Sequence, residues 1–251
     1  MKLIIRSFRF SVVLIALMAI TITPSRSQMN LKLGGGIGIT GPASDLAGST
    51  LDYYSGSNYG LSSGLTIHGK VKLGFSGLNL TGEVDYTSLR NTGNSEPGQG
   101  SVDISQKILS LKLGPEFRIS IPALPFTPYL GANLALNKFS GETAFQGASK
   151  VPSATYSVKD VSRFGVGFSA GSEVTIGPLL TLDFTVSYNL MNVSGKEWED
   201  VNPGVDQRID SYLALNDGSD PQYAAGDDKH FIANERSIRS ILFTVSILFG
   251  L

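Results

Sequence analysis

Residues 65–75 read LTIHGKVKLGF, and every second position in this stretch is apolar or glycine. The apolar positions are Leu65, Ile67, Val71, Leu73 and Phe75, whereas His68, Lys70 and Lys72 occupy the other parity. Alternation with a period of two predicts a β-strand whose two faces meet different surroundings. The rest of the chain indicates what covers each face.

The first 27 residues have the features of a secretory signal peptide. Basic residues precede an apolar run from Phe10 to Ile22, and small residues at Ser25 and Ser27 predict cleavage after Ser27. The alternative, a transmembrane anchor, needs about 20 apolar residues, and this run is shorter. We expect a mature chain of residues 28–251 with 16 basic and 21 acidic residues, a net charge of −5 that argues against nucleic acid as a partner.

The mature chain consists mainly of strand candidates about ten or more residues long. They lie at 29–40, 62–75, 78–89, 104–119, 126–139, 162–176, 180–192 and 237–251. Polar connections at 41–61, 90–103, 140–161 and 193–236 alternate with tight turns near 76–77, 122–125 and 177–179. Long loops at one end and tight turns at the other are typical of barrels in the outer membrane, with both termini at the periplasmic end.

Side-chain size predicts which face of each strand points outward. One parity carries bulky residues such as Leu109, Leu111 and Leu113, whereas the other is small or charged. A soluble lipocalin-like barrel alternates too, but with its apolar face inward. The interior of an eight-stranded barrel has little room, so we expect the bulky set outside in lipid and the small or charged set inside. The predicted fold is all-β, an eight-stranded antiparallel up-and-down transmembrane β-barrel.

Over residues 28–251, the chain resembles the small eight-stranded outer-membrane barrels of the OmpX and OmpA type. The resemblance rests on the architecture and on the final SILFTVSILFGL, which is similar to the closing strand recognised by the barrel-assembly machinery. The residues that would form this signal are Phe243, Val245, Ile247, Phe249 and Leu251. The family strand most often ends in Phe, whereas here Gly250 and Leu251 follow Phe249.

The inward parity predicts a set of charged side chains in the lumen. The bases are Lys32, Lys70, Lys72, Lys112, Arg118 and Arg163, and the acids are Glu83, Asp85, Glu116, Glu173 and Asp183, together with His68. Because unpaired charges in a narrow interior are costly, we expect ion pairs that plug the lumen. A two-residue turn at Ser76-Gly77 would set Lys70 opposite Glu83 and His68 opposite Asp85. The alternative is a charged pore lining.

Motifs for chemistry are sparse. Residues 36–41 match G-x-G-x-x-G, but Pro42 and a polar loop follow where a dinucleotide site needs a helix, so we interpret the glycines as strand positions with little room in the lumen. The chain has two histidines and no cysteine, which excludes thiol catalysis, disulfides and a lipoprotein anchor. Some barrels resembling this one modify lipid A through a lipid-facing Ser and His. His68 has lumen parity, so we expect no enzyme, no cofactor and no metal site.

The connection at 193–236 carries ten acids against four bases. We expect it to be a solvated acidic loop, with Ca²⁺ binding near Asp217–Asp220 and Asp227–Asp228 as the alternative. Trp198, Tyr212, Tyr223 and Phe231 give this loop the composition of a recognition surface. The sequence therefore predicts a monomeric outer-membrane barrel of a Gram-negative cell with a structural or surface-interaction role. Its partners would be outer-membrane lipids and lipopolysaccharide, the barrel-assembly machinery and an extracellular partner at 193–236. The alternatives are a narrow porin and a lipid A-modifying enzyme.

Overall fold

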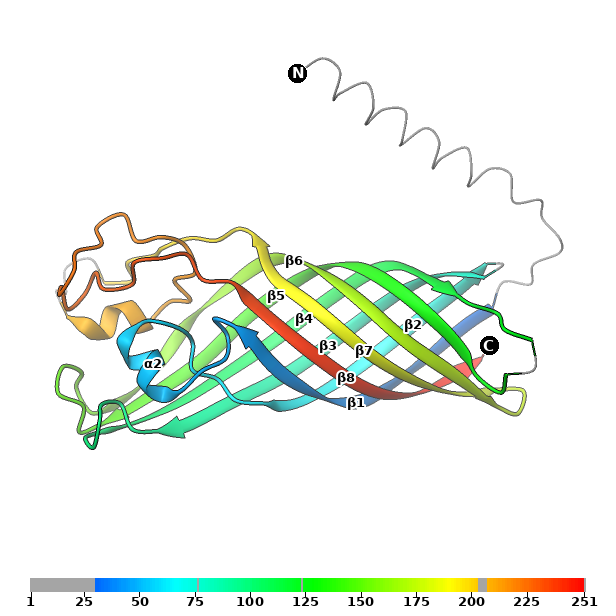
Figure 1. Cartoon of the computed structure of the whole chain (residues 1–251), viewed down its shortest axis with the longest axis horizontal. Helices are drawn as coiled ribbons and strands as arrows, with labels where there is room; N and C mark the ends of the chain where they lie inside the picture. Colours follow the sequence, from blue (N-terminus) through cyan, green and yellow to red (C-terminus); the bar gives the residue numbers. More distant parts are fainter. Residues whose placement is uncertain (1–29, 76, 123, 203–206, 251) are drawn as a thin grey trace, which may run out of the picture.

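The computed structural model describes residues 30–75, 77–122, 124–202 and 207–250, and these form a closed antiparallel β-barrel (Figure 1). Each strand pairs with its sequence neighbours, and β8 pairs with β1. The strands are β1 (Asn30–Ser44), β2 (Gly64–Phe75), β3 (Leu78–Gly93), β4 (Ser101–Arg118), β5 (Thr127–Gln146), β6 (Ala154–Ile176), β7 (Leu180–Ser194) and β8 (Ile238–Gly250). The predicted fold class is confirmed. The predicted signal peptide and the mature start at Gln28 lie outside the described residues.

The strands reach further at the long-loop end than predicted. β5 continues to Gln146 and β6 begins at Ala154, so the connection predicted at 140–161 is mostly strand. The other long connections are residues 45–63, 94–100 and 195–237. The extensions carry outward polar side chains that pair across strands, as Arg90 does with Asp103. When the outward residues of a strand are polar as well, apolar and polar residues no longer alternate, so the strand cannot be recognised from the sequence pattern.

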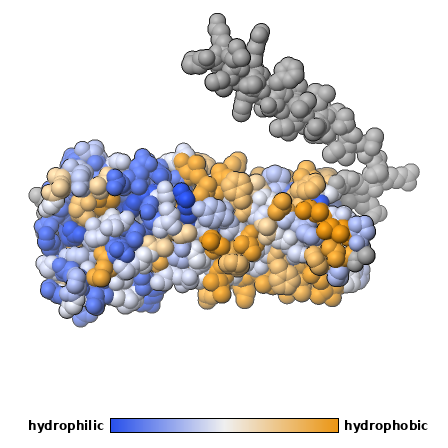
Figure 2. Space-filling view, in the orientation of Figure 1, coloured by the Kyte–Doolittle hydropathy of each residue, from blue (hydrophilic) through white to orange (hydrophobic). Residues whose placement is uncertain are grey.

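The outer face of the barrel is apolar over the half with the short turns (Figure 2). Leu65, Ile67 and Leu134 are 72%, 59% and 70% exposed, whereas Lys70 and Lys72 on the other parity are buried. The sequence expectation for residues 65–75 is therefore confirmed: the apolar side chains point outward and the charged ones point inward. We call this outward apolar surface the belt. Its edge on the side away from the short turns is formed by Ile39, Leu65, Tyr86, Leu136 and Tyr188.

Pairing around the ring fixes the tilt of the strands. Starting from Ile37 on β1, the partners in one direction lead to Ser162 on β6 and in the other direction to Ser172. This shift of ten residues is the stagger that closure of a tilted barrel requires, and it corresponds to a strand tilt of about 40°.

The glycines of β1 allow the strands to approach at the closing seam. Gly36 lies in the middle of β1, so the G-x-G-x-x-G match is a strand and begins no helix. A Cβ at Gly34 or Gly36 would lie 1.9 Å from the carbonyl oxygen of Ile247 or Val245 on β8. The expectation that these glycine positions have little room for a side chain is confirmed. The room is limited by the backbone of the neighbouring strand rather than by side chains across the lumen.

The long connections form a folded layer over one end of the barrel (Figure 1). Residues 45–63 contain the short helix α2 (Thr50–Ser55), which Ser49 caps and Gly56 ends in a left-handed conformation. Residues 195–237 contain the 3₁₀-helix η1 (Arg208–Tyr212). We call these two connections together the cap. Within the described part of the chain, no helix has the length and apolarity to cross a membrane.

Candidate functional site: a two-layer interior beneath a cap

The interior near the short-turn end is filled by charged side chains, which we call the basal network. Its members are Lys32, His68, Lys70, Lys72, Glu83, Asp85, Lys112, Glu116, Arg118, Glu173 and Asp183. These residues come from β1, β2, β3, β4, β6 and β7, and Tyr129 adds a contact from β5. Five cations face five carboxylates, so the network is electrically balanced when His68 is neutral.

Lys72 lies at the centre of the basal network. Its Nζ is 2.8 Å from Glu116 Oε2, 2.8 Å from Glu173 Oε1 and 3.1 Å from Asp183 Oδ2. It also lies 4.1 Å from the centroid of the Tyr129 ring. Lys72 is 1% exposed, so its charge is compensated by protein groups rather than by bulk water.

Both predicted cross-strand pairs are neighbours in the register of β2 and β3. Lys70 Nζ lies 2.9 Å from Glu83 Oε1 and equally far from Asp183 Oδ2 on β7. Asp85 Oδ1 lies 3.8 Å from His68 Nδ1, but a shorter contact of 2.6 Å joins Asp85 to Lys112. Lys70 and Glu83 therefore form the predicted ion pair, whereas Lys112 is the main partner of Asp85.

The remaining predicted members divide between the two ends of the barrel. Glu173 accepts from Lys32 at 2.6 Å and lies 3.4 Å from Arg118 Nη2, both within the basal network. Arg163 is not part of it. Its guanidinium lies at the cap, 2.9 Å from Asp217 and 3.1 Å from Glu197. The predicted excess of one base in the lumen therefore disappears, because Arg163 is neutralised by loop acids.

His68 contacts a hydroxyl that sequence reasoning did not find. Its Nε2 lies 2.9 Å from Ser246 Oγ on β8, although β1 separates the two strands. Gly36 pairs with both residues and has no side chain to intervene. Ser246, His68 and Asp85 thus follow the order of a hydrolase triad, but all three are buried inside the barrel, away from the belt where a lipid substrate would lie.

The interior near the cap is apolar instead of charged. Inward side chains from several strands are almost fully buried there, among them Leu89, Ile108, Phe139 and Ile238. They form one cluster with residues of the cap, including Tyr53, Tyr54 and Tyr212. The lumen therefore has two layers, a basal network and an apolar layer continuous with the cap.

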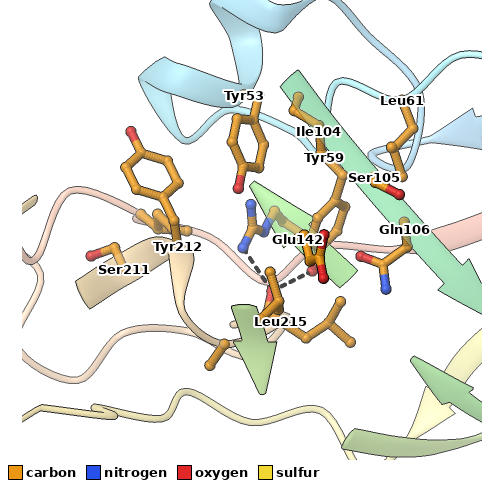
Figure 3. A pocket seen from close by; sticks show the side chains of 14 residues that line it. Tyr53, Tyr59, Leu61, Ile104, Ser105, Gln106, Glu142, Ser211, Tyr212 and Leu215 are labelled. Carbon is orange, nitrogen blue, oxygen red and sulfur yellow. Dashed lines mark hydrogen bonds between the residues drawn. The ribbon is translucent and has the colours of Figure 1, made fainter. Parts of the chain in front are cut away.

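Aromatic residues from both cap connections and from β5 pack together around Tyr212 of η1. Its ring centroid lies 5.1 Å from Tyr53, 5.2 Å from Phe145 and 5.7 Å from Phe231. Burial raises the pKa of the Tyr53 hydroxyl to about 12, so that it stays neutral at physiological pH. Beside these rings a cavity of about 20 Å³ remains (Figure 3), which is room for roughly one water molecule.

Two buried arginines tie the cap connections to each other. Arg208 donates to the carbonyl of Tyr54 and, at 3.1 Å, to the hydroxyl of Tyr212. Its guanidinium carbon lies 3.8 Å from the centroid of the Phe231 ring. Such stacking combined with charge-assisted hydrogen bonds suits the planar arginine group.

Arg236 makes the second tie, and it shares an acceptor with Tyr59 of the first cap connection. Its Nη2 donates to the carbonyl of Leu215 at 2.9 Å, and the Tyr59 hydroxyl donates to the same carbonyl at 2.8 Å. The two dashed lines that meet at Leu215 in Figure 3 mark such contacts. The guanidinium also lies 4.1 Å from the centroid of the Tyr59 ring.

The prediction of a solvated acidic loop at 193–236 holds for only some of its acids, because Glu197, Asp228 and Glu235 are exposed whereas three aspartates are buried. Asp210, Asp217 and Asp220 are 2%, 0% and 6% exposed. Asp217 pairs with Arg163, and Asp220 lies 2.9 Å from His230 Nδ1. These three aspartates are buried because Arg163, Lys229, His230 and the backbone amide of Asn202 contact them. Of the aromatic residues predicted for a recognition surface, Tyr212 is buried in the cap and Tyr223 is exposed.

Asp210 shares its surroundings with a second carboxylate, Asp200. Burial, followed by the contact with Asp200, raises the pKa of Asp210 to about 6. Lys229 Nζ lies 2.9 Å from Asp200 and 3.8 Å from Asp210. Among the residues that the structure describes, no group of three or more His, Asp or Glu side chains is arranged to hold a metal ion.

The outward side of β8 carries most of the predicted closing-strand signal. Phe243, Val245, Ile247 and Phe249 are all exposed on the belt, and β8 pairs with both β1 and β7. Leu251 lies outside the described residues.

Solved structures of several eight-stranded barrels resemble the chain at low sequence identity. Neisserial surface protein A is 15% identical, with a TM-score of 0.47 over 88% of this chain and 97% of the other. The attachment invasion locus protein Ail of Yersinia pestis, in complex with the heparin analogue sucrose octasulfate, is 11% identical, with a TM-score of 0.41 over 89% and 99%. OprG from Pseudomonas aeruginosa is 10% identical, with a TM-score of 0.46 over 90% and 97%.

No curated protein sequence matches the chain. The family described as outer membrane protein beta-barrel domain matches residues 10–207, which is more than half of the chain. This match agrees with the closed ring of eight strands and with the outward apolar belt. The chain belongs to the outer membrane β-barrel domain family and is a protein of the outer membrane.

Proposed function

We propose that the chain is a closed, non-conducting barrel that acts as a surface-binding protein through its cap. The observation that carries this proposal is the aromatic core around Tyr212, which joins the two cap connections to the apolar layer of the lumen. Loops that fold onto a shared core hold one shape, and a preorganised surface loses less entropy when it binds a partner. Connections that only joined strands would not need such a core.

Two separate layers of side chains, the basal network and the apolar layer, support the proposal that the lumen is closed. Ions that cross the barrel would have to pass the balanced basal network and then the apolar layer. The alternative, a narrow porin, is supported by the charged lining of the lower layer alone. Steady conductance in a planar lipid bilayer separates the two: the closed barrel gives none, and a stable open level from the unmodified protein would establish the porin.

The binding role needs a test that leaves the core of the cap intact. Tyr223 and Glu235 are exposed on the cap and lie outside its aromatic core. The double variant Tyr223→Ser, Glu235→Ser should reduce binding of the nanodisc-held protein to immobilised extracellular-matrix proteins or polysaccharides. The matched control is Lys138→Ser on the outer barrel wall, which should bind like the wild type. Equal binding by all three forms, or none by the wild type, would refute the role of the cap.

We further propose that the chain is a monomer without enzymatic activity. The buried positions of Ser246 and His68 support this, because a lipid A molecule in the membrane meets the belt and not the lumen. Incubation with lipid A should leave its mass spectrum unchanged. In the same proposal, outer-membrane lipids and lipopolysaccharide cover the belt, and the barrel-assembly machinery recognises β8.

A further inference from the structure

The connection between β4 and β5, residues 119–126, is the longest of the three short turns, and the structure describes all of it except Ala123. Its sequence ISIPALPF contains no charged residue and two prolines. Four large apolar side chains are exposed on it: Ile119 at 36%, Ile121 at 45%, Leu124 at 42% and Phe126 at 40%. Such a concentration of exposed apolar groups marks a contact surface, because it is unfavourable in water.

Backbone hydrogen bonds give the turn a defined shape. Ile119 N donates to the carbonyl of Pro128 at 2.8 Å, so the β4–β5 hairpin continues beyond its last ladder pair. Leu124 N donates to the carbonyl of Ile121 at 3.3 Å and forms a bend at the tip. Arg118 N donates to the carbonyl of Gly77 at 2.8 Å, which ties the base of the turn to the neighbouring short turn. The exposed side chains therefore sit on a hairpin tip.

The turn continues the lipid-facing belt without a polar break. On β4 the outward column runs through Leu111, Leu113 and Phe117 to Ile119, and on β5 Phe126 precedes outward Leu130. On the face shown in Figure 2, apolar residues extend to the short-turn end, with polar residues among them. In outer-membrane barrels this end faces the periplasm.

The height of the belt along the barrel axis is smaller than the apolar band typical of outer-membrane barrels. From Leu31 to Ile39 on β1, eight steps of about 3.3 Å at a tilt of about 40° span roughly 20 Å. Outer-membrane barrels typically present an apolar band of about 25 Å. Three further residues at the tip of the 119–126 turn add roughly 8 Å on the β4–β5 side, by the same rise and tilt.

We propose that the 119–126 turn inserts into the periplasmic leaflet and contacts the acyl chains of phospholipids there. Continuity with the belt favours lipid over a periplasmic protein, because protein interfaces surround their apolar centre with a polar rim and this turn has no charged residue to supply one. The contact extends the apolar surface beyond the belt on the β4–β5 side. It thereby contributes to how deep the barrel sits in the membrane.

The absence of cysteine from the chain makes a direct test simple, since any introduced cysteine is unique. Leu124→Cys, labelled with an environment-sensitive nitrobenzoxadiazole maleimide, is reconstituted in vesicles of phosphatidylcholine and phosphatidylglycerol. Doxyl-labelled lipid and aqueous iodide on both sides serve as quenchers. Leu134→Cys on the belt is the lipid control, and Ser219→Cys in the cap is the aqueous control.

We expect doxyl quenching at Leu124 within about twofold of that at Leu134 and at least about threefold above that at Ser219, because belt residues contact acyl chains. Quenching by iodide alone would overturn the proposal and leave the turn to water or to a periplasmic protein. Quenching by neither agent would also overturn it, because the probe would then be packed against protein. If Leu124→Cys fails to fold, as judged by heat-modifiable migration on gels, Ile121→Cys reports on the same tip.

Discussion

Replacement of Lys72 by methionine tests whether charge balance holds the basal network together. Lys72 contacts three carboxylates and is fully buried. After its removal, Glu173 keeps Lys32 and Asp183 keeps Lys70, whereas Glu116 keeps only a hydrogen bond from Asn79 at 2.8 Å. The variant therefore leaves five carboxylates against four cations in a buried space.

Removal of one partner of a buried ion pair costs about 3 to 5 kcal/mol, because the remaining charge is left uncompensated. We expect Lys72→Met to lower the free energy of unfolding by this amount. Glu116→Gln alone should cost only about 1 to 2 kcal/mol, a charged hydrogen bond, because Lys72 retains two carboxylates. The double variant restores the balance at four against four, so it should be more stable than Lys72→Met alone.

The measurement is equilibrium unfolding in urea in lipid or detergent, followed by far-ultraviolet circular dichroism, for the two single variants and the double variant. Lys138→Met is the control, because its pair with Asp160 is half exposed and should contribute under about 1 kcal/mol. If the two single costs simply add in the double variant, charge balance does not stabilise the network and the reasoning is refuted.

Four further outcomes are expected. Gly36→Ala should prevent or slow folding, as judged on gels, because its Cβ would lie 1.9 Å from a backbone carbonyl oxygen, whereas a Cβ at Gly69 would lie 4.0 Å from its nearest neighbour, so Gly69→Ala should fold normally; equal folding would contradict the close approach at the seam. Arg208→Ala should expose the cap to limited proteolysis while the barrel stays resistant; an unchanged cleavage pattern would show that this arginine is dispensable. Because the pKa of Asp210 is raised to about 6 in the folded cap, its ionisation opposes folding: cap stability should be greatest near pH 4, fall as the pH rises to 6 and stay level above it. Asp210→Asn should flatten this profile in protease protection, and an unaltered profile would assign the pH dependence to another group. The intact mass of protein from outer membranes should correspond to a chain that begins at Gln28, and a mass that includes residue 1 would contradict export through a cleaved signal.

The sequence was sufficient for the number and order of the strands and for the register of β2 and β3. A two-residue turn determines the register on both sides of it, so Phe75 opposite Leu78 places Lys70 opposite Glu83. Contacts across the lumen could not be predicted in this way. The approach of Lys72 to Asp183 depends on which strands face each other after closure, and that depends on the stagger summed around the whole ring.

The structure of the cap could not be predicted from the sequence for a different reason. Its buried residues, such as Ile209, Tyr212 and Leu215, follow no period of two or 3.6, because the segment is neither a strand nor a long helix. The excess of acids in 193–236 suggested solvation, but burial depends on partners. Arg163, the main partner of Asp217, lies on β6, more than fifty residues away in the sequence.

The order of the two layers bears on the porin alternative more than either layer does alone. An ion that enters from the periplasm meets the basal network first, where displacement of a lysine side chain would open a polar path. It then meets Ile108 and Phe139, whose side chains offer no group to replace its hydration shell, so the desolvation cost there is not repaid. On the proposal of a closed barrel, we expect the apolar layer to limit conduction even when the network rearranges. The same proposal predicts that a channel forms only when the cap and the apolar layer beneath it are displaced, and the contacts of Arg208 and Arg236 between the cap connections oppose that displacement.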